Sequence, residues 1–204
     1  MRARHKRWAA PFLEGHPEFY LEKVCAEDPF FQSHPLFLEI GSGKGDFVIQ
    51  MAAKQQGHYL ALEREISVLG TLGKKLVDSG LNNIRARGGD FDEVCEELKG
   101  LSFDAIYLNF SDPWPKKKHW KRRLTTKERL EKMSSLLGAG GLILVKTDND
   151  SLFEFTLEQA PSAGLKIVSS QEDYLFDEEK DAMSEYERSF RAEGKKIHRA
   201  VLSK

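Results

Sequence analysis

The feature that most constrains the fold of this chain is a regular alternation of short apolar segments with longer amphipathic segments. The apolar segments predict strands at residues 36–40, 59–63, 83–86, 103–110, 142–146, 165–168 and 197–202. The amphipathic segments predict helices at residues 47–53, 66–77, 91–98, 125–137 and 152–159. Strands that alternate with helices form βαβ units on a parallel sheet, so the sequence predicts a doubly wound α/β fold.

The chain has the length of one ordinary domain. Its 204 residues, of which 40% are hydrophobic, suffice for one core and are too few for two domains. Residues 1–34 are basic at the start and interrupted by prolines, which predicts an N-terminal arm with a short helical extension. We expect residues 35–204 to form a single domain.

Cysteine usage and hydropathy predict a cytoplasmic protein. The two cysteines, Cys25 and Cys95, lie far apart and have no metal-ligand spacing, which argues against disulfides and structural zinc. No apolar run approaches the roughly 18 residues of a membrane span. The basic start is not followed by the apolar core of a signal peptide. We therefore expect no membrane segment and no metal.

Basic residues are unevenly distributed along a chain whose net charge is −1. One group precedes residue 8, and a second places six lysines and arginines among the eight residues 116–123. Acidic residues concentrate at 172–187. The local field rather than the net charge steers a polyanion, so the basic segments are candidates for nucleic-acid contact. The alternative is that each run is simply a solvated surface.

A glycine-rich segment at residues 41–45 joins the first predicted strand to the first helix. Its glycines are Gly41, Gly43 and Gly45, a spacing that departs from the G-x-G-x-x-G of dinucleotide-binding folds. Glu63, about twenty residues on at the end of the second strand, can accept hydrogen bonds from a ribose diol. Glu39 would repel a pyrophosphate but suits the sulfonium and amino group of S-adenosylmethionine. Asp90 is either an adenine contact or a helix N-cap.

The segment N-F-S-D-P-W-P at residues 109–115 leaves the most apolar strand at the same edge of the sheet. Pro113 and Pro115 restrict its backbone, which would hold Asp112 and Trp114 in fixed positions. A rigid polar and aromatic loop followed by basic residues suits a flat base on a phosphate chain. Packing of Trp114 in the core and a purely structural Asp112 remain alternatives.

These segments resemble a known family. E-I-G-S-G-K-G with the acidic strand end is similar to class I methyltransferases, and N-F-S-D-P-W-P-K-K-x-H closely resembles the bacterial tRNA (guanine-N7-)-methyltransferases. Further matching segments are residues 1–6, 121–124, 146–148 and 185–190. The resemblance implies a Rossmann-like α/β fold with a mostly parallel seven-stranded sheet whose last strand is antiparallel. It implies methyl transfer from S-adenosylmethionine to N7 of a guanosine in the variable loop of tRNA.

The resemblance also implies roles for individual residues. Cofactor contacts fall on Glu39, Gly41, Gly43, Gly45, Glu63, Asp90 and Asp112, and Asp112 is in addition the catalytic residue. Contacts with the target nucleotide fall on Lys116, Asp148, Ser184, Glu185, Tyr186 and Glu187. RNA contacts fall on Lys118, His119, Trp120, Lys121, Arg122 and Arg123. Residues 171–190 are implied to be a mobile flap over the guanosine.

Two positions depart from the family pattern. Ser184 stands where the family usually has threonine, and Gly88-Gly89 precedes Asp90 where larger residues are common, which weakens the cofactor role of Asp90.

The expected chemistry agrees with this assignment. Guanine N7 carries a lone pair and no proton, so methylation needs alignment and exclusion of water rather than a general base. A fixed carboxylate favours the positive charge that develops on the purine ring, and Asp112, Asp148 and Glu187 are the candidates. Alternatives are a methyltransferase for another base or a small molecule, and a non-catalytic RNA-binding module. We expect tRNA as the partner of a monomer or homodimer.

Overall fold

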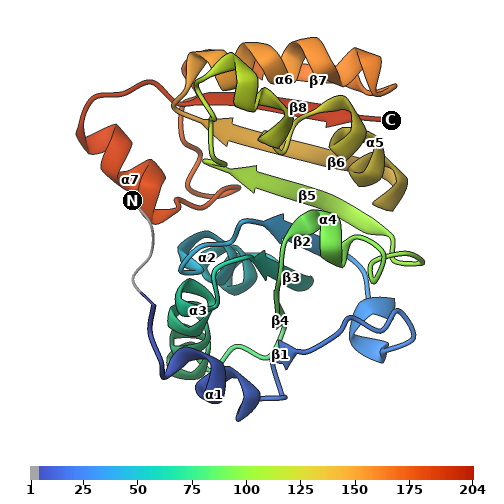
Figure 1. The fold of residues 1–204 in the computed structure, drawn as a ribbon, viewed down its shortest axis with the longest axis vertical. Helices are drawn as coiled ribbons and strands as arrows, with labels where there is room; N and C mark the ends of the chain where they lie inside the picture. The colour runs from blue at the N-terminus through green and yellow to red at the C-terminus, as the bar shows by residue number, and fades with distance from the viewer. Residues whose placement is uncertain (1–4) are drawn as a thin grey trace.

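The computed structural model describes residues 5–204, so the first four residues of the predicted basic arm lie outside the described part (Figure 1). One eight-stranded sheet has the order β1-β4-β3-β2-β5-β6-β8-β7. The strands are β1 Tyr20–Leu21, β2 Leu36–Ile40, β3 His58–Glu63, β4 Ile84–Gly88, β5 Phe103–Asn109, β6 Leu137–Thr147, β7 Lys166–Gln171 and β8 His198–Ser203. All neighbouring strands pair in parallel except that β8 is antiparallel to both β6 and β7. The predicted doubly wound α/β fold is confirmed, with β1 as an additional short strand.

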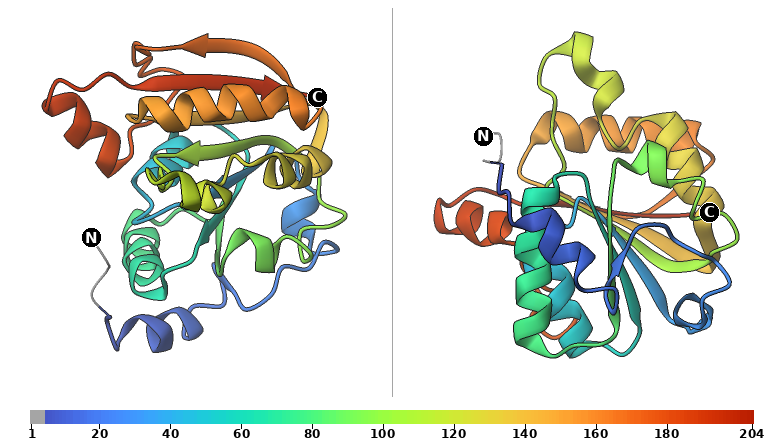
Figure 2. Two further views of the ribbon diagram at one scale, coloured as in Figure 1. Left: turned by 45° about the horizontal axis from the view of Figure 1, so that its top comes forward. Right: turned by 60° about the horizontal axis from the view of Figure 1, so that its bottom comes forward.

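Helices cover both faces of the sheet (Figures 1 and 2). They are α1 Ala9–Glu14, η1 Pro29–Gln32, α2 Asp46–Lys54, α3 Ile66–Ser79, α4 Phe91–Val94, η2 Lys117–Arg122, α5 Lys127–Leu136, α6 Asp150–Ser162 and α7 Glu185–Ala192. Side chains of α1, α2 and α3 share one buried cluster with one face of the sheet, and those of α4, α5 and α6 share another with the opposite face. Two cores on one sheet give the three-layer architecture of this fold class.

The N-terminal extension is packed on the sheet's helical layer rather than held away from it. Helix α1 lies against α3 at Gly70, where an added Cβ would come within 2.6 Å of the Ala9 Cβ. Strand β1 extends the sheet by pairing Tyr20 with Ala86 of β4. Residues 9–21 therefore contribute to the core that supports the first half of the sheet.

Three predicted boundaries differ from the structure. The helix before the glycines at 138–141 ends at Leu136, close to its predicted end, but β6 begins at Leu137 instead of residue 142 and runs through these glycines beside β5. Helix α4 has four residues instead of eight. Helix α7 lies in the segment predicted to be an irregular flap, where Ser184 caps it by accepting a hydrogen bond from Glu187 N at 3.1 Å. The pattern Ser-x-x-Glu is a capping signal that could have predicted this helix.

Candidate cofactor and substrate site

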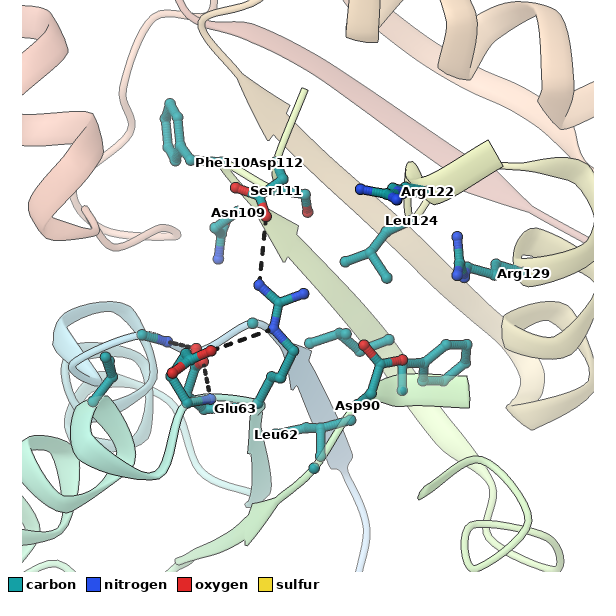
Figure 3. A pocket seen from close by; sticks show the side chains of 18 of the residues that line it. Leu62, Glu63, Asp90, Asn109, Phe110, Ser111, Asp112, Arg122, Leu124 and Arg129 are labelled. Carbon is teal, nitrogen blue, oxygen red and sulfur yellow. Dashed lines mark hydrogen bonds and ion pairs between the residues drawn. The ribbon is translucent and has the colours of Figure 1, made fainter. Parts of the chain in front are cut away.

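A cavity of about 440 Å³ lies at the carboxyl ends of the central strands, in the size range of small-molecule sites. Figure 3 shows Glu63 and Asp90 on one side of it and Asp112 on the other. Of the predicted site residues, those that line it are Gly41, Gly43, Glu63, Asp90, Asp112, Arg122 and Tyr186. This is the edge at which parallel α/β sheets bind ligands, because the loops that follow the strands meet there.

The glycine-rich loop turns sharply and approaches the end of β3. Gly41, Gly43 and Gly45 have φ of 78°, 57° and 82°, a region that favours glycine. A Cβ on Gly45 would also come within 2.6 Å of Leu72 Cγ in α3. Gly43 N donates to Glu63 Oε2 at 2.9 Å, and Glu65 N donates to Glu63 Oε1 at 2.8 Å (Figure 3). Glu63 is thus held in place at the cavity wall, and each of its oxygens keeps a lone pair for a further donor.

Glu39 is a buried carboxyl with an unused acceptor. The residue is 3% exposed, and Asn109 Nδ2 donates to its Oε1 at 2.9 Å. Its Oε2 has no hydrogen-bond partner among the described residues, while the adjacent Ile40 and Gly41 line the cavity. Burial raises the pKa of Glu39 to about 8. A buried carboxyl with an orphaned oxygen is suited to a ligand that brings a positively charged donor.

Asp90 performs the capping role that we considered as an alternative. Its carboxylate accepts a hydrogen bond from Asp92 N at 3.0 Å and caps α4. Asp90 also lines the cavity, so its position is compatible with a ligand contact as well.

The loop after β5 combines strained backbone with an exposed carboxylate. Phe110 and Trp114 have φ of 55° and 41°, values that non-glycine residues adopt rarely and mostly where function requires them. Asp112 is exposed, and its Oδ2 lies 3.6 Å from an Arg64 guanidinium nitrogen across the cavity. Trp114 is half-buried under the Arg122 guanidinium, 4.9 Å from its ring centroid, so it lies at the site rather than in the core. Arg64, which directly follows Glu63 and also lines the cavity, was not among the residues predicted for the site.

Arg123 is buried, unlike its basic neighbours. It is 0% exposed, and its guanidinium donates to the Pro113 carbonyl at 2.8 Å and to Ser151 O and Oγ at 3.0 Å each. These contacts fasten the Asp112 loop to the start of α6, and the RNA contact of Arg123 stays a prediction.

The other residues of the basic segment form a projecting surface. Helix η2 stands out from the body of the molecule in the right-hand view of Figure 2. The exposed basic residues on and beside it are Lys116, Lys117, Lys118, Lys121 and Arg122. His119 and Trp120 are half-buried, and Trp120 packs against Phe155 of α6 with ring centroids 5.6 Å apart. The structure thus presents cations beside the cavity, with Trp120 anchoring the helix that carries them.

The predicted tetrapeptide at 184–187 divides between the cavity and the interior. Tyr186 lines the cavity, and Glu185 pairs with Lys44 of the glycine-rich loop at 2.8 Å. Glu187 is 0% exposed, with Oε2 2.7 Å from Lys146 Nζ and Oε1 2.8 Å from Arg191. Both oxygens of Glu187 thus face internal cations, and its contact with the nucleotide stays a prediction. Asp148 lies 3.5 Å from Lys195 and does not line the cavity.

Residues 5–204 contain neither a candidate metal site nor a candidate membrane span. No group of three or more histidine, cysteine or acidic side chains in that range is placed to hold a metal ion. No helix there has the length and apolarity to cross a membrane.

Known proteins that are similar to this chain are methyltransferases. A family model described as "Putative methyltransferase" matches residues 33–200. The tRNA (guanine-N(7)-)-methyltransferase of Limosilactobacillus reuteri (strain DSM 20016) is 36% identical, over 100% of this chain and 99% of its own. The enzyme of that name from Streptococcus mutans serotype c is 37% identical, over 98% of each chain.

Solved structures are similar in fold. The 16S rRNA methyltransferase KamB superposes with a TM-score of 0.63 at 17% identity, over 89% of this chain and 98% of its own. An antibiotic-related methyltransferase gives the same TM-score at 16% identity, over 98% of this chain and 96% of its own. At these identities the likeness concerns the methyltransferase fold alone. The full-length relatives, the family model and the geometry of the cavity together show that the chain belongs to the S-adenosylmethionine-dependent tRNA (guanine-N(7)-)-methyltransferase family.

Proposed function

We propose that this enzyme transfers the methyl group of S-adenosylmethionine to N7 of a guanosine in the variable loop of tRNA. The observation that carries the proposal is the position of Asp112, on a rigid loop at the rim of the cavity and beside exposed cations. We further propose a cytoplasmic location, with residues 35–204 as the methyltransferase domain and residues 1–34 as an extension of it.

The cavity fits the proposed cofactor. Glu39 offers an unpaired buried oxygen for the amino group, and Glu63 offers a fixed carboxylate for the ribose diol. Asp90 lines the cavity, and we assign it to the adenine edge. Bound S-adenosylmethionine supplies an electrophilic methyl group on a positively charged sulfur.

The protein's own residues then have three tasks. Asp112 provides a negative charge near the guanine ring, which becomes more positive as N7 is alkylated, and so favours the transition state over the ground state. Trp114 and Tyr186 line the cavity and exclude water from it. The exposed lysines and Arg122 around η2 hold phosphates, which set the position of the tRNA without reading its sequence.

The test is incubation with labelled S-adenosylmethionine and unmodified tRNA, followed by nucleoside analysis. Label in 7-methylguanosine at a single variable-loop position is expected. Label in another nucleoside would retain the fold and the cofactor but refute the base assignment.

Binding of the cofactor is expected to release a proton from Glu39. With a pKa of about 8, raised by burial, this carboxyl is mostly protonated at pH 7, whereas a cationic ligand stabilises its ionised form. Cofactor affinity should therefore rise between pH 6 and pH 8. Calorimetric titrations at pH 7 in two buffers of different protonation enthalpy measure the released proton, and Glu39→Gln should remove this contribution. Equal heats for the wild-type protein in both buffers would refute the assignment.

Neutralising the projecting basic surface is expected to weaken tRNA binding mainly at low salt. The variant Lys118→Ala/Lys121→Ala/Arg122→Ala removes three exposed charges, and each lost phosphate contact reduces the slope of log K against log salt by about 0.9. A control variant removes Lys23, Lys99 and Lys166, which are also exposed but lie outside the basic segment 116–123. The same slope for both variants would rule out phosphate contacts at η2.

A further inference from the structure

Lys146 is a buried cation at the carboxyl end of β6. Its side chain is 4% exposed, and its Nζ lies 3.0 Å from Asp181 Oδ2, 2.9 Å from the Ala182 carbonyl and 2.7 Å from Glu187 Oε2. A buried ammonium is costly unless it is paired and hydrogen-bonded. All of these acceptors belong to residues 177–187, here called the strap. If the strap left this position, the buried ammonium group of Lys146 would lose its acceptors.

The other side-chain contacts of the strap are weaker. Lys54 and Gln50, one turn apart on α2, donate to the carbonyls of Glu178 and Met183 at 2.8 and 2.9 Å. The pair of Lys44 and Glu185 is about half exposed on both sides, and such pairs contribute little. The buried contacts of Lys146 therefore fix the position of the strap, and the hydrogen bonds from α2 hold it near the glycine-rich loop.

The backbone of Lys146 contacts the Asp112 loop, which forms the side of the site opposite the strap. Lys146 pairs with Asn109 in the sheet, and its carbonyl accepts a hydrogen bond from Phe110 N at 2.8 Å. Phe110 begins the loop that carries Asp112, and its ring lies 5.6 Å from that of Phe190 in α7. One residue therefore contacts the Asp112 loop through its backbone and the strap through its side chain.

We propose that Lys146 is a positioning residue for the target nucleotide, holding Ser184, Glu185 and Tyr186 in register with Asp112 across the mouth of the cavity. The inference rests on the proposed function, because it assigns the strap to the nucleotide side of the same site. Lys146 touches neither substrate; it acts by fixing one wall of the site against the other.

The first test compares Lys146→Met with Lys146→Arg and with Lys54→Met. Misplacement of a binding wall by about 1 Å costs on the order of 100-fold, so kcat/KM for tRNA should fall by about that factor in Lys146→Met. The Kd for S-adenosylmethionine should change far less than kcat/KM, because Glu39, Glu63 and the glycine-rich loop keep their positions, and loss of the Lys146 charge only adds to the raised pKa of Glu39. Lys146→Arg should recover part of the activity. Lys54→Met, which loses exposed contacts to the same strap, should lose less than about threefold.

A second variant separates positioning from folding. Lys146→Met alone leaves the buried carboxylate of Asp181 without a cation and that of Glu187 paired with Arg191 alone, which can unfold the protein. The variant Lys146→Met/Asp181→Asn/Glu187→Gln removes all three charges together. This neutral variant should fold, bind S-adenosylmethionine and still methylate tRNA poorly. The backbone amide hydrogens of its strap should exchange with solvent faster than in the wild type. Wild-type turnover by the neutral variant, or a parallel loss of cofactor affinity, would overturn the proposal.

The two proposals fail in different ways. If the wild-type protein forms no 7-methylguanosine, the proposed function is refuted. Hydrogen exchange of the strap in the variants needs no turnover, and slow exchange that is unchanged in the neutral variant refutes the role of Lys146 independently.

Discussion

Asp112→Ala is expected to lower kcat for tRNA methylation by about 10²–10³, the loss typical of removing one preorganised electrostatic group from an active site. The carboxylate lies at the cavity rim, where it stabilises the positive charge that develops on guanine. Because Asp112 is exposed and its 3.6 Å contact with Arg64 is long, the substitution should leave the fold intact. Single-turnover methylation at saturating tRNA and cofactor measures the effect directly.

Two comparisons sharpen this test. Asp112→Asn keeps the size and removes the charge, so a loss close to that of the alanine variant would attribute the effect to charge. Asp78→Ala removes an exposed aspartate near the end of α3 and should have turnover equal to the wild type. Near wild-type turnover by folded Asp112→Ala would refute the catalytic role.

The adjacent arginines 122 and 123 are expected to respond oppositely to alanine substitution. Arg123→Ala should lower the free energy of unfolding by about 3 kcal/mol, because it leaves a cavity and unpaired acceptors at Pro113 and Ser151. Arg122→Ala should change that free energy by at most about 0.5 kcal/mol, as exposed substitutions do, and should weaken tRNA binding.

Urea unfolding and the salt dependence of tRNA binding together distinguish the two roles. If Arg123→Ala has unchanged stability and a flatter salt slope, then Arg123 contacts phosphate and its internal hydrogen bonds are dispensable. Loss of stability with an unchanged slope in the folded fraction is the expected result.

The sequence predicted those strands whose own hydropathy pattern is that of a strand, and it failed where pairing with a distant segment determines the conformation. The strands from β2 to β8 contain apolar runs, except that β4 alternates apolar residues with arginines, and both patterns are visible in the sequence alone. Strand β1 has only two residues in a proline-interrupted segment, and it is a strand because Tyr20 pairs with Ala86. The glycines in β6 resemble a helix end locally, but pairing of Leu137 with Phe103 in β5 decides their conformation.

The sequence predicted where in the fold the site lies better than it predicted which charged side chains face the solvent. Glu39, Glu63 and Asp112 follow or lie within strands whose carboxyl ends meet, so the topology alone brings them together. Whether a charged side chain faces water or the interior depends on segments far away in the chain. Arg123 is buried because Ser151 lies beside it, and Glu187 because Lys146 does. No spacing within 116–123 or 184–187 contains that information.

The antiparallel strand β8 has a consequence for the order of events during synthesis. It is inserted between β6 and β7, so β7 has no neighbour in the sheet until β8 has been synthesised and paired. The Asp112 loop and the glycine-rich loop lie on strands translated much earlier, and N-terminal parts of a chain are available to fold first. The strap lies between β7 and β8 in the chain, and its Tyr186 lines the cavity. A nascent chain that has not yet formed β8 therefore holds an open cleft, and both walls face a transfer RNA only after β8 has paired.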